Sequence, residues 1–235
     1  MIIGGGLMAR AFATYKELDD VVVLAAGVAN SRETRTESFD RETRLVKKTI
    51  DTIGSKLLIY FSTCSMYDPD TAGTPYVCHK LGIEKMVRER VPNYLLFRFP
   101  QVVGNTTNVT TLVSFLYNSI VTQQPIDVWD NARRYIIDAD DAVRIVSYVV
   151  DNRVFKNRTV NVALRPCLVA DLVDTLEEIT GKMAVCTHSE RGSYYAIDTT
   201  DIMPILKELK IEFGPDYLSR VLSKYYASKQ ADLCK

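Results

Sequence analysis

The sequence has few of the residues that would hold together a small disulfide-rich or zinc-binding fold. Of its 235 residues, five are cysteine and two are histidine. The cysteines are odd in number and include no Cys-x-x-Cys pair, so the pattern indicates neither a disulfide framework nor a zinc site. We expect no metal site. Unpaired cysteines are typical of a reducing compartment, and we expect a cytoplasmic protein.

The sequence also lacks long apolar runs and an excess of one charge. No stretch approaches the roughly 20 apolar residues of a membrane span. The N-terminus reaches glycine after three residues, unlike a secretory signal peptide. Lys plus Arg and Asp plus Glu number 29 each, and the charges are interspersed. We therefore expect a small-molecule substrate and neither a nucleic acid nor a membrane as partner.

Short apolar runs alternate with segments of helical period along the first half of the chain. Strands are predicted at residues 1–3, 21–26, 56–62 and 94–99, and helices at residues 7–17, 37–53 and 80–90. This alternation indicates βα units and a mostly parallel sheet. We predict an α/β fold, a Rossmann-type doubly wound parallel sheet with a small C-terminal α/β substrate-binding part.

The pattern loosens after Gly104. Helices are predicted near residues 111–122, 140–151 and 169–180, and strands at residues 133–138 and 159–163. We expect residues 1–104 to form the dinucleotide-binding core, with residues of about 134–163 returning to its sheet. Residues 105–235 would form mainly the substrate-binding part. No low-complexity linker separates the two parts, so we expect them to share an interface.

A glycine-rich turn follows the first predicted strand. Residues 3–9 (IGGGLMA) form a GxGxxA pattern between a strand and a helix. Glycines allow a tight turn and close approach to a pyrophosphate, and the helix N-terminus offers free N–H groups. The candidate cofactor-binding residues are therefore Gly4, Gly6, Leu7 and Met8. By itself, the pattern is equally compatible with a glycine-rich turn that binds no ligand.

Small residues end the second predicted strand. Ala25, Ala26 and Gly27 lie at its carboxyl end, where open α/β sheets bind ligands. Their small side chains would leave room for a flat ligand, so all three are candidate cofactor-binding residues. A tightly packed strand end explains the tetrapeptide Ala-Ala-Gly-Val at least as well when it is considered alone.

The most specific pattern lies between the third strand and its helix. Ser62 and Thr63 close the strand, and Tyr76 and Lys80 lie one turn apart on one helix face. An unperturbed tyrosine has a pKa of about 10, and the Lys80 ammonium could favour the ionised phenol. Thr63 could donate a hydrogen bond to the reacting oxygen. We predict Thr63, Tyr76 and Lys80 as catalytic residues beside a nicotinamide, with Ser62, Tyr76 and Lys80 also contacting the cofactor.

With these sites the chain resembles the extended short-chain dehydrogenase/reductase family of sugar-nucleotide epimerases, dehydratases and reductases. Residues 98–104 (RFPQVVG) resemble a family segment that places Pro100 at the cofactor and Gln101 at the substrate. Residues 133–141 resemble the family's RDFIHVDD segment, whose leading arginine, here Arg133, binds the substrate diphosphate. The resemblance implies NAD or NADP as cofactor and a nucleotide-sugar substrate, as in polysaccharide biosynthesis. It leaves open a homodimer through helices 37–53 and 80–90.

The resemblance is to a compact variant with a shortened N-terminal half. Family members have a second strand, a helix and a third strand between the glycine turn and the alanine-rich strand. Here only about a dozen residues intervene. The residue near the adenosine ribose that would distinguish NAD from NADP is therefore lacking.

The residues after Thr63 bear on the reaction. Family dehydratases carry an Asp-Glu pair there, and this chain has Cys64 and Ser65, so dehydration is the least expected reaction. A 4-ketoreductase or an epimerase remains open: Tyr76 would be the general acid/base, Lys80 would lower its pKa and Thr63 would orient the sugar oxygen. The competing hypothesis is a non-catalytic Rossmann-like regulatory or partner subunit. The trimmed adenosine side favours it, and the intact set of Thr63, Tyr76 and Lys80 disfavours it.

Overall fold

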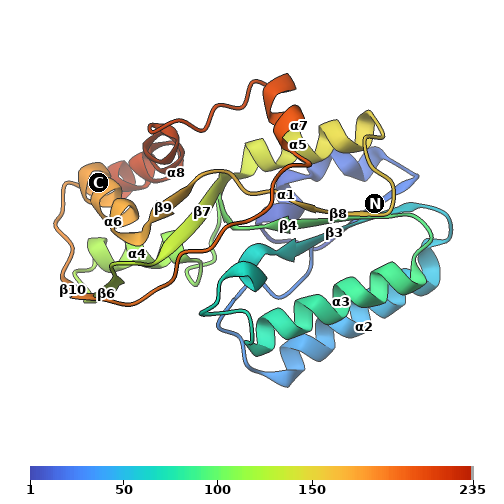
Figure 1. The fold of residues 1–235 in the computed structure, drawn as a ribbon, viewed down its shortest axis with the longest axis horizontal. Helices are drawn as coiled ribbons and strands as arrows, with labels where there is room; N and C mark the ends of the chain where they lie inside the picture. Colours follow the sequence, from blue (N-terminus) through green and yellow to red (C-terminus); the bar gives the residue numbers. More distant parts are fainter. Residues whose placement is uncertain (234–235) are drawn as a thin grey trace.

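The computed structural model describes the backbone of residues 1–233 and the side chains of residues 1–229. A parallel five-stranded sheet forms its centre, in the order β1-β2-β3-β4-β8 (Figure 1). The strands are β1 (Ile2–Ile3), β2 (Val21–Leu24), β3 (Leu57–Thr63), β4 (Tyr94–Phe99) and β8 (Arg158–Asn161). All of β2 and most of β3 and β4 are buried. Burial on both faces explains their continuous apolar sequences.

Helices cover both faces of the central sheet (Figure 1). Helices α1 (Leu7–Ala11) and α5 (Ala139–Asp151) lie on one face, and α2 (Thr36–Ile53) and α3 (Pro75–Arg90) lie on the other. Alternate residues of β2 face the two helix layers, because Val21 and Val23 belong to one hydrophobic core and Val22 and Leu24 to the other. The predicted Rossmann-type doubly wound α/β fold is confirmed.

The first predicted helix, residues 7–17, is wrong in part. The α-helix ends at Ala11, and a 3-10 helix, η1 (Ala13–Glu17), follows. Phe12 is fully buried against Phe61 at 4.9 Å between ring centroids, and Tyr15 is buried beside it at 5.5 Å. Because side chains three residues apart eclipse in a 3-10 helix, the tighter turn puts both rings on the sheet.

A second part lies beside the sheet (Figure 1). It contains a three-stranded sheet of β5 (Gln101–Val103), β7 (Arg133–Asp138) and β9 (Pro166–Leu168), and a two-stranded sheet of β6 (Ile126–Trp129) and β10 (Cys186–Ser189). Its helices are α4 (Leu112–Val121), α6 (Val169–Thr180) and α8 (Tyr217–Leu233), whereas α7 (Met203–Glu208) packs on α5 beside the central sheet (Figure 1). Within residues 134–163, β8 joins the central sheet and α5 packs on α1, whereas β7 pairs with β5 and β9.

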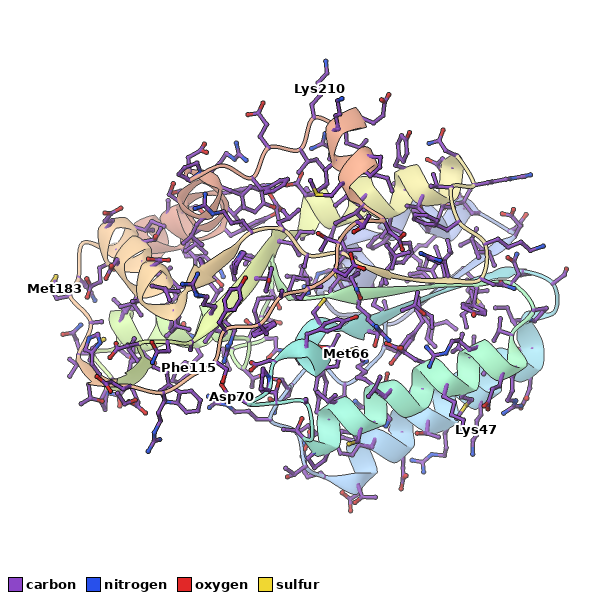
Figure 2. All side chains as sticks on the ribbon, in the orientation of Figure 1. Lys47, Met66, Asp70, Phe115, Met183 and Lys210 are labelled. Atoms are coloured by element: carbon purple, nitrogen blue, oxygen red, sulfur yellow. The ribbon has the colours of Figure 1, made fainter. Side chains whose placement is uncertain are left out.

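A segment without regular structure, residues 190–199, runs from β10 toward α7 across the junction of the two parts (Figure 1). The Ser193 hydroxyl donates a hydrogen bond to Asp70 at 3.2 Å, and Asn161 donates to the Asp198 carbonyl at 2.8 Å. Figure 2 shows Asp70 at this junction. The segment therefore ties the second part to the carboxyl end of the sheet.

Among the described residues, no helix has the length and the apolar character needed to cross a membrane. Cys64, Cys78, Cys167 and Cys186 are free thiols. Cys234 lies outside the described residues.

Candidate active site

The glycine turn lies at the carboxyl end of β1, directly beside the end of β2. Gly4 has φ +137°, and a Cβ there would lie 2.5 Å from the Ala25 carbonyl oxygen. Only glycine therefore allows this approach. A Cβ on Gly5 or Gly6 would meet nothing within 4 Å, so the outer side of the turn is open. The structure thus brings the turn together with Ala25 and Ala26.

Leu7 and Met8 are half-buried and pack on neighbouring residues. A Cβ on Gly104 would lie 2.7 Å from the Leu7 Cδ1 atom, so Leu7 packs on the end of β5. Met8 packs against the main hydrophobic core. Their contact with a cofactor stays a prediction.

The space beside Gly27 is filled by side chains of the protein. A Cβ on Gly27 would lie 2.5 Å from the Lys80 Nζ atom and 2.7 Å from the Glu42 Oε1 atom. The direction in which a side chain at this position would point is therefore occupied, and the predicted contact of Gly27 with a cofactor stays a prediction. Glycine is needed here because a buried ion pair approaches the backbone.

The hydroxyls of Ser62 and Thr63 both have partners. Ser62 donates to the buried Glu84 carboxylate at 2.6 Å. Thr63 caps η2 (Cys64–Tyr67), where its hydroxyl accepts from the Ser65 N–H at 3.0 Å and donates to the Ser65 hydroxyl at 2.9 Å. A hydrogen bond from Thr63 to a ligand requires its hydroxyl hydrogen to turn away from Ser65.

Helix α3 holds the Tyr-x-x-x-Lys pair. It begins at Pro75, where the Thr74 side chain accepts from the Val77 N–H. Tyr76 is 7% exposed, and its hydroxyl has no hydrogen-bond partner in the part of the chain that the structure describes. Lys80 is 3% exposed and donates to Glu42 at 3.0 Å and to the Tyr60 hydroxyl at 2.9 Å. The tyrosine is therefore free to bind an oxygen, whereas the lysine is anchored.

Lys80 is anchored by Glu42 of α2, a residue that was not predicted for the site. Burial opposes ionisation of its carboxyl group, but a hydrogen bond from His79 and the charge of Lys80 outweigh this and hold the pKa of Glu42 well below its ordinary value. Burial and the Glu42 charge raise the pKa of Tyr60 well above its ordinary value. The sequence did carry one indication that Glu42 is buried. It lies at helical spacing from Phe39 and Val46, on the buried face of α2.

A second buried carboxylate, Glu84, supports the ends of β3 and β4. Arg98 donates two hydrogen bonds to it, at 2.6 and 2.8 Å. Burial opposes ionisation, but these bonds and the one from Ser62 lower the pKa of Glu84. The Cys64 thiol donates to the Arg98 carbonyl, and burial raises the pKa of this thiol well above its ordinary value. Cys64 therefore has a packing role.

The predicted substrate side starts where Pro100 separates β4 from β5. Gln101 opens β5, which pairs in parallel with β7, the strand of Arg133. In the described residues Arg133 pairs with no carboxylate, and its guanidinium lies 5.3 Å from the centre of the Tyr194 ring. The adjacent Arg134 instead pairs with Asp68 at 3.2 Å. Arg133 is thus the one of the two neighbouring arginines that is available to an anion.

The segment at residues 190–199 contributes further side chains that were not predicted from the sequence. Gly192 has φ +95°, and a Cβ there would lie 2.4 Å from the Ala132 nitrogen, so the segment runs directly against the start of β7. This approach places Tyr194 over Arg133, and Arg191 lies 5.9 Å from the centre of the Trp129 ring. No local sequence signal joins these distant positions.

No group of three or more His, Cys, Asp and Glu side chains in the described part of the chain is arranged to hold a metal ion.

The glycine turn after β1 and the Tyr-x-x-x-Lys helix after β3 define a dinucleotide-binding α/β enzyme of the short-chain dehydrogenase/reductase type. Residues 4–163 match the model of the NAD dependent epimerase/dehydratase family, and the chain belongs to this family. The match confirms the predicted family. It also confirms the predicted class, an NAD(P)-dependent enzyme of the extended short-chain dehydrogenase/reductase type. In a sequence comparison with curated proteins, nothing matches.

Solved structures share the fold at low sequence identity. The UDP-glucose 4-epimerase of Thermus thermophilus, in complex with NAD, has a TM-score of 0.68 and 12% identity, covering 94% of this chain and 83% of that one. RMD from Pseudomonas aeruginosa, complexed with NADPH, has a TM-score of 0.69 and 15% identity, covering 97% of this chain and 88% of that one. UDP-glucuronic acid 4-epimerase from Bacillus cereus has a TM-score of 0.67 and 18% identity, covering 95% of this chain and 78% of that one.

Proposed function

We propose that the chain is an NAD(P)-dependent enzyme that modifies the sugar of a nucleotide sugar, as a 4-ketoreductase or an epimerase. The observation that carries this proposal is the unpartnered hydroxyl of Tyr76, one helical turn from the buried Lys80. This hydroxyl has no protein partner and is not among the fully buried polar atoms of the described residues, so a substrate oxygen can reach it. A substrate oxygen would supply that partner, and proton transfer needs such contact.

The residues present fit NAD or NADP on the phosphate and nicotinamide sides. The outer face of Gly5 and Gly6 is open, and Gly4 touches the end of β2 at Ala25. Gly4, Gly6, Leu7 and Met8 would hold the phosphates through their backbone, and Ala25, Ala26, Ser62, Tyr76, Lys80 and Pro100 would adjoin the nicotinamide half. When bound, the nicotinamide would exchange a hydride with the sugar carbon. The related structures that contain NAD or NADPH support this assignment.

On the adenosine side, the central sheet ends at β1 within the described residues. No neighbouring strand there supplies a side chain for the adenosine ribose. We therefore propose no preference for NAD over NADP.

The residues of the chain would divide the chemistry as follows. Tyr76 gives its hydroxyl proton to the oxygen of a 4-keto sugar, or takes a proton from the sugar hydroxyl in the reverse direction. Lys80 would be the cation of the centre, held by Glu42 and Tyr60 one helical turn from Tyr76. Thr63 would turn its hydroxyl hydrogen away from Ser65 and donate a hydrogen bond to the same sugar oxygen. Arg133 binds the diphosphate, because a guanidinium fork matches phosphate oxygens.

Dehydration is the reaction that the structure supports least. It needs an acid and a base next to Thr63, and these positions hold Cys64 and Ser65. The Cys64 thiol is buried and has a raised pKa, and Ser65 is hydrogen-bonded to Thr63.

Gln101 would contact the sugar of the substrate from the start of β5. The nucleotide sugar in the Bacillus cereus epimerase structure is UDP-glucuronic acid, so UDP-sugars and their 4-keto forms should be screened first.

Titration of the protein into NADH or NADPH, followed by nicotinamide fluorescence, is the first experiment. Binding of either cofactor supports the enzyme. The second candidate function is a non-catalytic regulatory or partner subunit, favoured by the engaged Thr63 hydroxyl and the end of the sheet at β1. Absence of binding at millimolar cofactor would refute the enzyme and support this alternative.

Replacing Tyr76 by phenylalanine tests the proposed acid/base. Tyr76→Phe should lower kcat by at least about 10²-fold with little change in NADH affinity, since it removes the proton donor and keeps the ring. Tyr148→Phe, on α5, serves as the control and should leave kcat unchanged. Turnover of Tyr76→Phe at the wild-type rate would refute the assignment of Tyr76 as the acid/base.

The use of cofactor distinguishes the two proposed reactions. Consumption of reduced cofactor in proportion to product indicates a reductase, and a cofactor that is needed only in catalytic amounts indicates an epimerase.

A homodimer through α2 and α3 is part of the proposal. The two helices lie side by side on one face of the sheet (Figure 1), and Lys47 points outward from α2 (Figure 2). Light scattering of the purified chain would measure its mass, and a monomer at all concentrations would refute the dimer.

A further inference from the structure

The Glu42 carboxylate receives four hydrogen-bond donors in a buried position. Its side chain is 2% exposed. The Oε1 atom accepts from the Tyr60 hydroxyl at 2.7 Å and from Lys80 at 3.0 Å. The Oε2 atom accepts from the Val28 N–H at 2.7 Å and lies 3.0 Å from the His79 Nε2 atom. A carboxylate with this many donors is fixed in orientation as well as in charge.

Four separate elements meet at this carboxylate. Glu42 belongs to α2, Tyr60 to β3 and Lys80 to α3, and the backbone donor follows β2. The backbone at Gly27 comes so close that a Cβ would lie 2.5 Å from the Lys80 Nζ atom. The position of the ammonium is therefore set by contacts that are far apart in the sequence.

We propose that Glu42 is a positioning residue of the proton-transfer centre, which acts by holding the Lys80 ammonium at the end of β2. This inference rests on the proposed function, because the position of Lys80 matters for turnover only if Tyr76 transfers a proton. Nothing in the family match or the related structures assigns a role to Glu42.

The flexible side chain of lysine explains why a positioning residue is needed. Its four-carbon stem has many rotamers, and a buried ammonium without a partner is unfavourable. Glu42 and Tyr60 use two of the three N–H donors of Lys80. The third donor has no protein partner among the described residues. The proposed function assigns this donor to the cofactor, so Glu42 would fix the direction from which Lys80 meets the cofactor and the Tyr76 phenol.

A double-mutant cycle tests this role, with Glu42→Gln, Lys80→Met and the double variant. The readouts are kcat, KM for the nucleotide sugar and NADH affinity. Glu42→Gln should lower kcat by about 10- to 100-fold at unchanged KM, as expected for a displaced catalytic group. In the Lys80→Met background the same substitution should change kcat and NADH affinity by less than about twofold, because Glu42 acts through Lys80.

Glu42→Asp is the second variant, which keeps the charge and covers the case in which Glu42→Gln does not fold. It should retain at least about fivefold more turnover than Glu42→Gln, or measurable turnover where Glu42→Gln is unfolded. Losses that multiply in the double variant, or wild-type kcat in Glu42→Gln, would overturn the inference alone. A wild-type chain that binds neither NADH nor NADPH would instead refute the proposed function and the inference together.

Discussion

The Gly27→Ala variant separates two explanations for the glycine at the end of β2. If Gly27 borders a cofactor, an added methyl group should weaken cofactor binding and leave the folded chain as stable as before. If Gly27 makes room for the ion pair, the methyl group should destabilise the protein. Its Cβ would lie 2.5 Å from the Lys80 Nζ atom and 2.7 Å from the Glu42 Oε1 atom.

The size of the effect follows from these distances. Optimal contacts to carbon are about 3.5 Å, so the Nζ atom must withdraw by roughly 1 Å. Its 3.0 Å hydrogen bond to Glu42 would then be lost. A hydrogen bond to a charged group contributes about 1.5–3 kcal/mol, and a glycine-to-alanine change returns about 0.4–1 kcal/mol through the unfolded chain. We expect a net loss of about 1–2 kcal/mol in the free energy of unfolding.

Urea denaturation of the purified chain measures this loss, and Gly82→Ala is the matched control. Gly82 lies in α3, where a Cβ would meet nothing within 4 Å. In the control, alanine should stabilise the helix by about 0.5–1 kcal/mol. The two variants should therefore shift the unfolding midpoint in opposite directions. If Gly27→Ala proves as stable as Gly82→Ala, the ion-pair explanation is wrong.

Two further predictions concern the second part and the response to acid. Arg133→Ala should raise the Kd of a UDP-sugar by about 10- to 100-fold at unchanged NADH affinity, as measured by isothermal titration. Arg134→Ala should instead destabilise the fold, because it leaves Asp68 without its ion-pair partner. A UDP-sugar affinity of Arg133→Ala equal to that of the wild type would refute the role of Arg133 in binding the diphosphate. The pKa of Glu84 is lowered on folding, so its contribution to stability is present above its ordinary pKa of 4.5 and is lost as pH falls through the lower folded value. In urea unfolding, wild type and Glu84→Gln should therefore differ most above about pH 5 and converge in stronger acid, and a constant difference would contradict this.

The strands of the central sheet could be predicted because their signal is local. Buried parallel strands consist of continuous apolar runs, and β3 and β4 follow this rule from Leu57 and Tyr94 onward. The break of the first helix at Phe12 could not be predicted, because it depends on the contact of this ring with Phe61 in a strand about fifty residues later. The short β6 and β10 form a separate two-stranded sheet, and their sequences carry little pattern.

In the site, the sequence reveals residue types and spacing but not the partners of each group. Tyr76 and Lys80 were predictable from their spacing on one helix. The hydrogen bond of Thr63 to Ser65 was not, because it depends on the conformation of η2 after the strand. The ion pair beside Gly27 was not predictable either, because its side chains come from α2 and α3. Small residues at a strand end thus indicate close approach without identifying what approaches.

Strand β3 connects the two buried carboxylates to the proton-transfer centre. Tyr60 and Ser62 are two residues apart, so they face the same side of the sheet, and they donate to Glu42 and Glu84 respectively. Each carboxylate also binds a cation, Lys80 or Arg98. The strand that ends in Thr63 is therefore held by charge-assisted hydrogen bonds at two successive positions on this face. Because these supporting groups already have partners, the free hydroxyl of Tyr76 is the group of the centre left to bond an incoming oxygen without prior rearrangement.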